Sequence, residues 1–335
     1  MNTVLVQGRI AVEKVDLLRA RLDDDWRVTT WQPGDAVEAF APLAVEVDIV
    51  VGGGIPVSPW PAVPKLKLFQ IPWAGHEFTS ADRMPAGVPV CNTYEHESTI
   101  AEYVLLGMLE SRIGLRLMDA RFRAKGWAGR LPGTGATHGE IRGATVGIVG
   151  YGHIGHEVAV RARAFGMNVV GVRRSRPPCP PELDWLGTNE RLDELMALSD
   201  FVVVACDLNA ETHGLIDAHR LGLMKPTAVI INVARGKIID EATLYEALKA
   251  RRIGGAVIDV WYDYNEPGKP EVKPAHHPFE ELDNILCSGH VCGWTQEMID
   301  RRWDFVAENI RRVMRGEAPG NLLYRGTQAR PAGTA

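Results

Sequence analysis

Short runs of apolar, mostly β-branched residues alternate along the chain with longer stretches in which apolar residues recur at helical spacing. In the first third of the sequence the short runs predict strands at residues 4–6, 45–51, 66–71 and 88–91. Helical spacing covers residues 12–22 and the long apolar stretch 98–120, for which we expect Ser98 to be the N-cap.

The same alternation starts again after residue 140. It predicts strands at residues 145–149, 168–172, 201–206, 228–233, 256–260 and 285–287, and helices at 154–165, 191–198, 241–250 and 296–315. Such alternation is typical of parallel strands joined by crossover helices. We therefore expect an α/β protein with two doubly wound parallel-sheet domains, Rossmann-like or flavodoxin-like, and a cleft between them. The break falls near residues 92–100, and the final helix is expected to return to the first domain.

Composition mainly excludes classes of protein. The 335 residues suffice for roughly two domains. The net charge is −5 and no long basic run occurs, which argues against nucleic-acid binding. No stretch approaches the roughly 20 apolar residues of a membrane span, and no secretory signal is visible. The 5 cysteines are odd in number and lack a C-x-x-C pair, which predicts reduced cytoplasmic thiols and no metal site.

Residues 150–155 read GYGHIG and fit the G-x-G-x-x-G fingerprint of dinucleotide binding. The motif follows an apolar strand and opens a helix, as the fingerprint requires. Gly150 permits the tight turn, Gly152 lets the backbone approach a pyrophosphate, and Gly155 allows close packing of helix and strand. The free N–H groups at the helix N-terminus favour the phosphates.

The next strand ends in a way that bears on the choice of cofactor. An acidic residue about 20 positions after the glycines usually binds the ribose 2′-hydroxyl of NAD. Arg173, Arg174, Ser175 and Arg176 stand there instead. Guanidinium groups bind phosphate in a bidentate manner, so these residues favour NADP. NAD remains possible if they form only a solvated basic turn.

Several further motifs occur in a characteristic order. They are LKLFQIPWAGHEF at 66–78, STIAE at 98–102, IRGATVGIVGYGHIG at 141–155, MKPTAVIINVARGKIIDEATL at 224–244, GAVIDVWY at 255–262 and SGHVCGWT at 288–295. With these motifs the chain resembles the D-isomer-specific, NAD(P)-dependent 2-hydroxyacid dehydrogenases over most of residues 45–325. The resemblance implies a discontinuous substrate domain (1–97 with 293–330), a cofactor domain (98–292) and a flexible tail (331–335).

The resemblance also implies roles for three residues. Arg235 binds the substrate carboxylate and polarises the keto oxygen, His290 is the acid and base, and Asp259 binds the nicotinamide carboxamide. An Arg fork orients a 2-keto acid, and an imidazole exchanges protons near neutral pH. Asp259 could instead only cap a loop.

Other matched positions are expected to line the two binding sites. The remaining cofactor residues are His153, Ile154, Cys206, Asp207, Val233 and Ala234. The substrate loop is expected to comprise Trp73, Ala74, Gly75 and His76, with Trp294 as a further wall. For these aromatic side chains core packing is an equally good interpretation.

The chain departs from the family pattern in several places. The family has a Glu five residues after the strand-end Asp, where it raises the pKa of the catalytic His; here the residue is Tyr264. We expect Glu266 or Asp263 to replace it, or else His290 to work without a carboxylate and with a lower pKa. Asp207 replaces a usual proline and, if it faced the ribose, would oppose a 2′-phosphate. Trp73 replaces the first glycine of the substrate loop.

These features favour an oxidoreductase that transfers a hydride between NADP(H) and a small 2-keto or 2-hydroxy acid. Glyoxylate, hydroxypyruvate and phenylpyruvate-like acids all remain open. The alternatives are a family member acting on a phosphonate-type substrate and a nicotinamide-sensing protein without activity. The family resemblance further implies a homodimer, formed through helix 98–120 and the arm 122–130.

Overall fold

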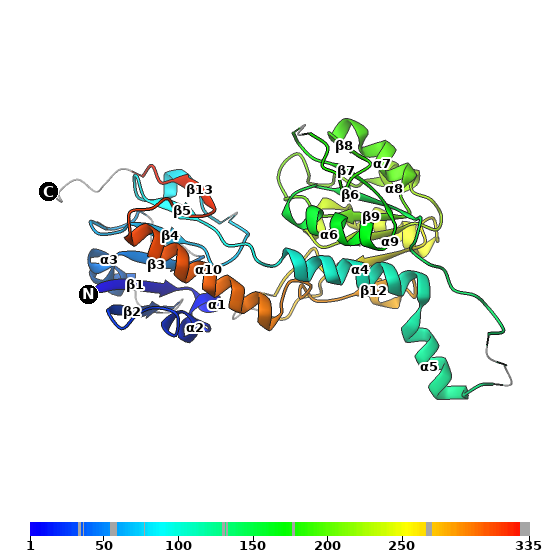
Figure 1. Cartoon of the computed structure of the whole chain (residues 1–335), viewed down its shortest axis with the longest axis horizontal. Helices are drawn as coiled ribbons and strands as arrows, with labels where there is room; N and C mark the ends of the chain where they lie inside the picture. The colour runs from blue at the N-terminus through cyan, green and yellow to red at the C-terminus, as the bar shows by residue number, and fades with distance from the viewer. Residues whose placement is uncertain are drawn as a thin grey trace. The chain divides into compact units, whose positions relative to one another are not determined.

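The computed structural model describes residues 1–328 except 33–34, 36, 54–58, 77, 129–130, 132, 176–177 and 266–269. It divides into two compact units, Met1–Glu95 with Thr295–Ala335, and His96–Trp294. Figure 1 traces both units.

The first unit is built on a 6-stranded sheet of order β13-β5-β4-β3-β1-β2. Its strands are β1 (Asn2–Gln7), β2 (Trp26–Trp31), β3 (Ile49–Gly52), β4 (Leu68–Gln70), β5 (Pro89–Cys91) and β13 (Leu322–Arg325). All pairs are parallel except β13 with β5. Its helices are α1 (Arg9–Val12), α2 (Val15–Arg19), α3 (Phe40–Glu46) and α10 (Gln296–Met314), with 3₁₀ turns at Val37–Ala39 and Ala81–Arg83.

Helices cover both faces of this sheet. Apolar residues of α1, α2 and α10 bury one face. On the other face, apolar residues of α3 and the buried Trp60 form one cluster with Phe69 of β4. The α10 helix begins where the Thr295 side chain accepts a hydrogen bond from the Met298 N–H. This last helix belongs to the unit that contains the N-terminus.

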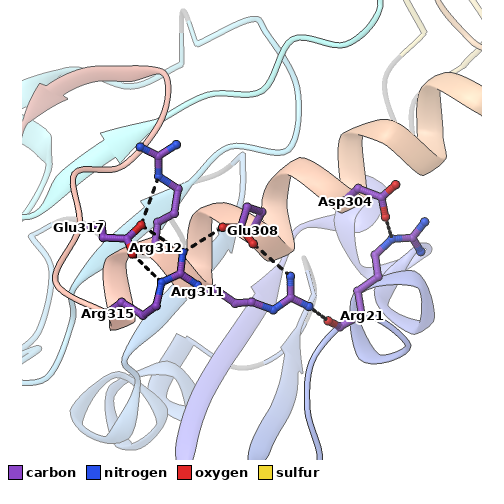
Figure 2. Close-up of polar contacts among 7 residues, drawn as sticks. All are labelled: Arg21, Asp304, Glu308, Arg311, Arg312, Arg315 and Glu317. Carbon is purple, nitrogen blue, oxygen red and sulfur yellow. Dashed lines mark hydrogen bonds and ion pairs between the residues drawn. The ribbon is translucent and has the colours of Figure 1, made fainter.

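Ion pairs fix the exposed side of α10, as Figure 2 shows. Arg21, which follows α2, lies 2.6 Å from Asp304. Near the C-terminal end of the helix, Arg315 pairs with Glu308 at 3.0 Å and Glu317 at 2.6 Å. Exposed pairs contribute little singly, so we assign this network a role in orientation and the apolar face the larger share of stability.

The second unit is built on a 7-stranded parallel sheet of order β12-β11-β10-β9-β6-β7-β8. Its strands are β6 (Thr145–Val149), β7 (Asn168–Val172), β8 (Trp185–Gly187), β9 (Phe201–Val204), β10 (Val229–Asn232), β11 (Gly255–Ile258) and β12 (Ile285–Cys287). Its helices are α4 (Glu97–Ile113), α5 (Leu115–Lys125), α6 (His153–Ala164), α7 (Leu192–Leu198), α8 (Ala218–Leu223) and α9 (Glu241–Lys249), with 3₁₀ turns at Asn189–Arg191, Gly236–Ile238 and Phe279–Glu281.

The two faces of this sheet are also covered. Apolar residues of α4 and α6 pack on one face, and those of α7, α8 and α9 pack on the other. The α5 helix buries none of its side chains and extends from the body of its unit in Figure 1. The structure thus confirms the prediction of two doubly wound α/β units.

Some local predictions were wrong. The single helix predicted at 98–120 is interrupted at Gly114, whose φ of 69° is left-handed and ends α4. Ser98 does not cap it: the N-cap is His96, and the Ser98 hydroxyl instead accepts a hydrogen bond from Arg161 at 2.6 Å. The helix predicted at 12–22 is two short helices.

Five elements carried too weak a sequence pattern to be predicted. They are β2, β8, β13, α3 and α8. The α3 helix also includes the first two residues of the strand predicted at 45–51, which begins only at Ile49. The three strands lie at sheet edges or are partly exposed, so their residues do not form an apolar run. The α8 helix has 6 residues and only one buried side chain, too few for a periodic pattern.

Candidate active site

The sequence-predicted site residues of the second unit gather at one edge of its sheet. Gly150 follows β6, Cys206 lies two residues beyond β9, and Arg235 lies three residues beyond β10. Asp259 follows β11, and His290 lies three residues beyond β12. Because the strands are parallel, all five positions lie at the carboxyl edge, where α/β proteins bind ligands.

The glycine turn has the backbone that a dinucleotide requires. Gly150 has φ 99°, and a Cβ there would lie 2.5 Å from the Cys206 backbone, so a larger residue is excluded. A Cβ on Gly152 would meet no atom of the described residues within 4 Å, so they leave open space beside this glycine. A Cβ on Gly155 would lie 3.0 Å from Ile148 and the Gly150 carbonyl.

The α6 helix that follows is suited to bind phosphate. Its N-cap is Gly152, and no side chain caps it. The first N–H groups of a helix have no partner within the helix, and at the start of α6 His153 is exposed and Ile154 half-buried. The residues present therefore fit the pyrophosphate of a dinucleotide cofactor.

The basic turn after β7 borders a hollow. Arg173 is half-buried and its N–H donates to the Gly187 carbonyl at 3.0 Å, whereas Arg174 and Ser175 are exposed. The hollow has a volume of about 460 Å³ and is lined by Arg174, Thr188, Asn189, Glu190 and Glu211. The polar residues from 188 onward were not expected from the sequence, because they follow a strand that the pattern did not reveal. Arg176 lies outside the described residues.

The segment after β9 completes this side of the site. Cys206 is half-buried and touches the glycine turn, and burial raises the pKa of its thiol to about 12. Asp207 is exposed, and its carbonyl accepts a hydrogen bond from Thr212 at 2.6 Å. Cys206 is therefore a neutral packing residue rather than a nucleophile.

Arg235 is held by the turn that follows β10. The Asn232 side chain accepts from the Ala234 N–H at 3.1 Å and donates to the Arg235 carbonyl at 3.0 Å. Val233 and Ala234 are buried, whereas Arg235 is half-buried. A Cβ on Gly236 would lie 2.3 Å from the Trp261 carbonyl, so this glycine allows the turn to pack against the segment after β11.

His290 has a strained backbone that the surrounding loop supports. Its φ is 58°, in the left-handed region that few residues other than glycine adopt. Its N–H donates to the Asp259 carbonyl at 2.7 Å. Strain of this kind persists where the neighbouring structure determines the conformation, and such positions cluster at functional sites.

The Asp259 carboxylate organises that loop. It is fully buried and accepts hydrogen bonds from the Ser288 hydroxyl at 2.5 Å and from the Val291 and Cys292 N–H groups, each at 3.0 Å. Ser288 is in turn 2.6 Å from the Tyr103 hydroxyl on α4. The structure thus gives Asp259 a clear loop-fixing role. Tyr103 and Ser288 were not found from the sequence.

The electrostatics follow from this arrangement. Burial would raise the pKa of Asp259, but the hydrogen bonds from Cys292, Ser288 and Val291 outweigh it and lower that pKa below 3.8. Crowding by protein atoms lowers the pKa of His290 below 6.5, although the residue keeps an exposed surface. The Arg235 guanidinium lowers it further, whereas Asp259 acts in the opposite sense.

The structure does not bring Asp263 to His290. Its carboxylate lies 3.7 Å from Nε2 of His276, which also pairs with Glu241 at 3.0 Å. Glu266 lies outside the described residues. The ring beside His290 is that of Tyr264, with centroids 5.5 Å apart and planes inclined by 60°.

The expected substrate loop belongs to the first unit. Trp73 is half-buried and packs against that unit's core beside Phe78, with ring centroids 6.4 Å apart. Ala74 and Gly75 are half-buried, and His76 is exposed. In the second unit, Trp294 keeps 50% of its surface exposed.

The fold and the glycine turn define an α/β protein of two doubly wound units that binds a nucleotide. Comparison with known proteins agrees with this class. The family described as "D-isomer specific 2-hydroxyacid dehydrogenase, NAD binding domain" matches residues 105–292. The chain belongs to the D-isomer specific 2-hydroxyacid dehydrogenase family.

Among curated proteins, glyoxylate reductase of Thermococcus onnurineus is 37% identical over 187 residues, which are 56% of this chain and 53% of that protein. (S)-sulfolactate dehydrogenase of Chromohalobacter salexigens is 32% identical over 64% of this chain and 66% of that protein. The matched region thus spans about half to two thirds of these relatives' length.

Solved structures match over nearly the whole chain. A D-isomer specific 2-hydroxyacid dehydrogenase from Xanthobacter autotrophicus, in complex with NADPH and MES, has a TM-score of 0.74 and 26% identity, covering 97% of this chain and 98% of that one. A family protein from Aeromonas salmonicida has a TM-score of 0.76 and 24% identity, covering 96% and 99%.

Two features are absent from the part of the chain that the structure describes. None of its helices has the length and apolar character of a membrane span. No group of three or more His, Cys, Asp or Glu side chains in that part of the chain is placed to hold a metal ion.

Proposed function

We propose that this protein interconverts a small 2-keto acid and the corresponding D-2-hydroxy acid with NADP(H). The observation that carries the proposal is the common edge of the second unit's sheet, where the glycine turn, Arg235 and His290 follow β6, β10 and β12. A nucleotide-binding turn, a cation for a carboxylate and an imidazole for a proton are the groups that this reaction needs.

In the reduction, the bound cofactor supplies the hydride that reaches the carbonyl carbon. The Arg235 guanidinium binds the substrate carboxylate and orients the keto group, since its fork matches a carboxylate in two parallel hydrogen bonds. His290, when protonated, gives its proton to the keto oxygen and becomes neutral. One hydride and one proton convert the ketone to the alcohol, and in the reverse direction neutral His290 takes the hydroxyl proton.

The preference for NADP rests on Arg173, Arg174 and Ser175. These residues lie at the end of β7, where a cofactor on the glycine turn places its ribose. Glu190 and Glu211 line the same hollow as Arg174, and Asp207 is exposed after β9, so carboxylates oppose the arginines. We give the arginines more weight because they stand directly at the discriminating turn.

A kinetic assay tests the activity. Initial rates would be measured with glyoxylate, hydroxypyruvate and phenylpyruvate, each with NADPH and NADH. We expect turnover that prefers NADPH and falls by about 10²–10⁴-fold in His290→Gln. Arg252→Ala, at an exposed arginine of the same unit, is the control for loss of a surface charge. Nucleotide binding without turnover of any acid would favour a nicotinamide sensor instead.

The loop of residues 73–76 is the proposed determinant of substrate choice. Trp73 stands where the family pattern has glycine, and His76 is exposed. Trp73→Gly should therefore widen the range of 2-keto acids accepted, measured as kcat/KM ratios between phenylpyruvate and glyoxylate. An unchanged ratio would assign Trp73 to packing alone.

We also propose a homodimer through α5. Exposed apolar side chains are frequent on this helix and just beyond it: Leu115, Leu117, Met118, Phe122 and Trp127. A patch of this kind marks a protein interface. Sedimentation of Phe122→Asp should show a monomer where the wild type sediments as a dimer.

The compartment we propose is the cytoplasm, because all five cysteines are free.

A further inference from the structure

Tyr264 belongs to a chain of contacts around His290 that closes on itself. The Trp261 indole Nε1–H donates to the Ser288 carbonyl at 2.7 Å. The Trp261 backbone N–H donates to the Tyr264 hydroxyl at 3.1 Å. The Tyr264 ring lies against the His290 ring, with centroids 5.5 Å apart. The segment after β11 therefore contacts the loop after β12 at two points: Trp261 contacts Ser288, and Tyr264 contacts His290.

Two separate sets of contacts hold different parts of His290. Asp259, through Ser288 and the backbone of residues 290–292, fixes the strained main chain. These contacts leave the imidazole able to rotate about its side-chain bonds. The Tyr264 ring lies against the imidazole itself, and its position is fixed by the hydroxyl contact with Trp261.

We propose that Tyr264 is a positioning residue that replaces an acidic partner beside His290 and orients the imidazole without adding charge. The proposal rests on the proposed function, because it assigns a partner to the acid–base group of that reaction. A phenol stays neutral near pH 7, and burial raises the pKa of Tyr264 above 10.0. It therefore covers one side of the imidazole without attracting a proton to it.

The charged groups that face His290 agree with this role. Among the described residues of its unit they are the Arg235 guanidinium, which disfavours the protonated imidazole, and the Asp259 carboxylate, which favours it. The Asp259 carboxylate is already engaged by three hydrogen bonds from the loop. The free protein should thus hold a neutral imidazole at pH 7, ready to accept a proton from a hydroxy acid.

The test follows the titration of His290 by NMR in the protein without cofactor or substrate. His290→Gln identifies the signal among the 10 histidines. In the wild type His290 should titrate below 6.5. Tyr264→Glu should raise its pKa by about one pH unit or more, because an opposite charge is now adjacent. Tyr264→Ala should move it toward the ordinary value, and Tyr264→Phe, which keeps the ring, should shift it least.

Asp263→Asn is the matched control. It removes a carboxylate next to Tyr264 in sequence that faces His276, so the titration of His290 should not move. Identical titrations in the wild type, Tyr264→Ala and Tyr264→Glu would overturn the proposal. So would a wild-type His290 that titrates above 6.5 and falls in Glu266→Gln, since this result would identify a carboxylate partner.

The same variants separate this proposal from the proposed function. Because the titration needs no turnover, shifted titrations in a protein that reduces no 2-keto acid would support the Tyr264 contact and reject the activity. Turnover of a 2-keto acid with unchanged His290 titrations would support the activity and reject the Tyr264 proposal. In an active enzyme, the pH at which kcat/KM for reduction falls should rise in Tyr264→Glu by the amount that NMR measures.

Discussion

The indole of Trp73 lies directly against Gly53. A Cβ on Gly53 would be 1.7 Å from Cζ2 of Trp73, a separation that no packed structure tolerates. The observed position of the Trp73 indole, in the proposed substrate loop, therefore requires a glycine at position 53, directly after β3. The two positions form one packed unit, so the loop cannot change at one of them independently of the other.

Gly53→Ala should therefore destabilise the protein by about 1–3 kcal/mol, the usual result of overpacking. In a Trp73→Gly background the same change should cost much less, because the ring is absent. Urea unfolding of the four proteins of this double-mutant cycle measures the coupling. The control is Gly222→Ala, at an exposed glycine of α8 with no neighbour within 4 Å and no positive φ. Equal costs in both backgrounds would mean that the indole moves away freely.

Asp259 should be a major source of stability at neutral pH. Its folded-state pKa is lowered below 3.8, so its contribution is present above that value and is lost as the pH falls through the lowered pKa. Asp259→Asn brings amide N–H groups toward the donors of the loop and should cost about 2–4 kcal/mol at pH 7.

Two milder variants accompany that test. Ser288→Ala removes one donor to Asp259 and should cost about 1 kcal/mol. Asp283→Asn, at an exposed partner of Arg251, should cost less than about 1 kcal/mol. The difference between Asp259→Asn and wild type should shrink toward low pH in urea titrations. A difference that does not change with pH would contradict the lowered pKa.

The sequence predicts those features of the molecule that depend on residues lying close together in the chain. The Gly150 turn is visible because a positive φ, a strand and a helix start all lie within a few residues. Arg235 and His290 are visible as members of motifs. The contact of Tyr103 with Ser288 joins residues 185 positions apart, and no local pattern contains it. Likewise the sequence shows that Tyr264 departs from the family pattern, but only packing shows that its ring lies against His290.

Arg174 should determine the cofactor preference. Arg174→Ala removes a charge-assisted contact worth about 1.5–3 kcal/mol, so KM for NADPH should rise by about 10- to 100-fold, with little change for NADH. Glu211→Gln removes a carboxylate from the same hollow and should lower KM for NADPH.

Arg191→Ala is the matched control for that prediction. Arg191 stacks on Trp185 with its guanidinium 3.7 Å from the ring centre and pairs with Glu194 at 2.7 Å, so it is already engaged by its own unit. Its loss should leave the ratio of NADPH to NADH turnover unchanged. A fall in both cofactors' affinities on Arg174→Ala would mean that this arginine supports the turn rather than the 2′-phosphate.

The pH dependence of the reduction should differ between the free and the substrate-bound enzyme. Reduction needs protonated His290, so kcat/KM should fall as the pH rises through the lowered pKa of the free enzyme. A bound substrate carboxylate neutralises Arg235, one of the groups that lower this pKa, and therefore raises it in the complex. The fall in kcat should occur at a higher pH than the fall in kcat/KM, and Arg235→Gln should bring the two together. Coincident profiles in the wild type would show that substrate binding does not relieve the effect of Arg235 on His290.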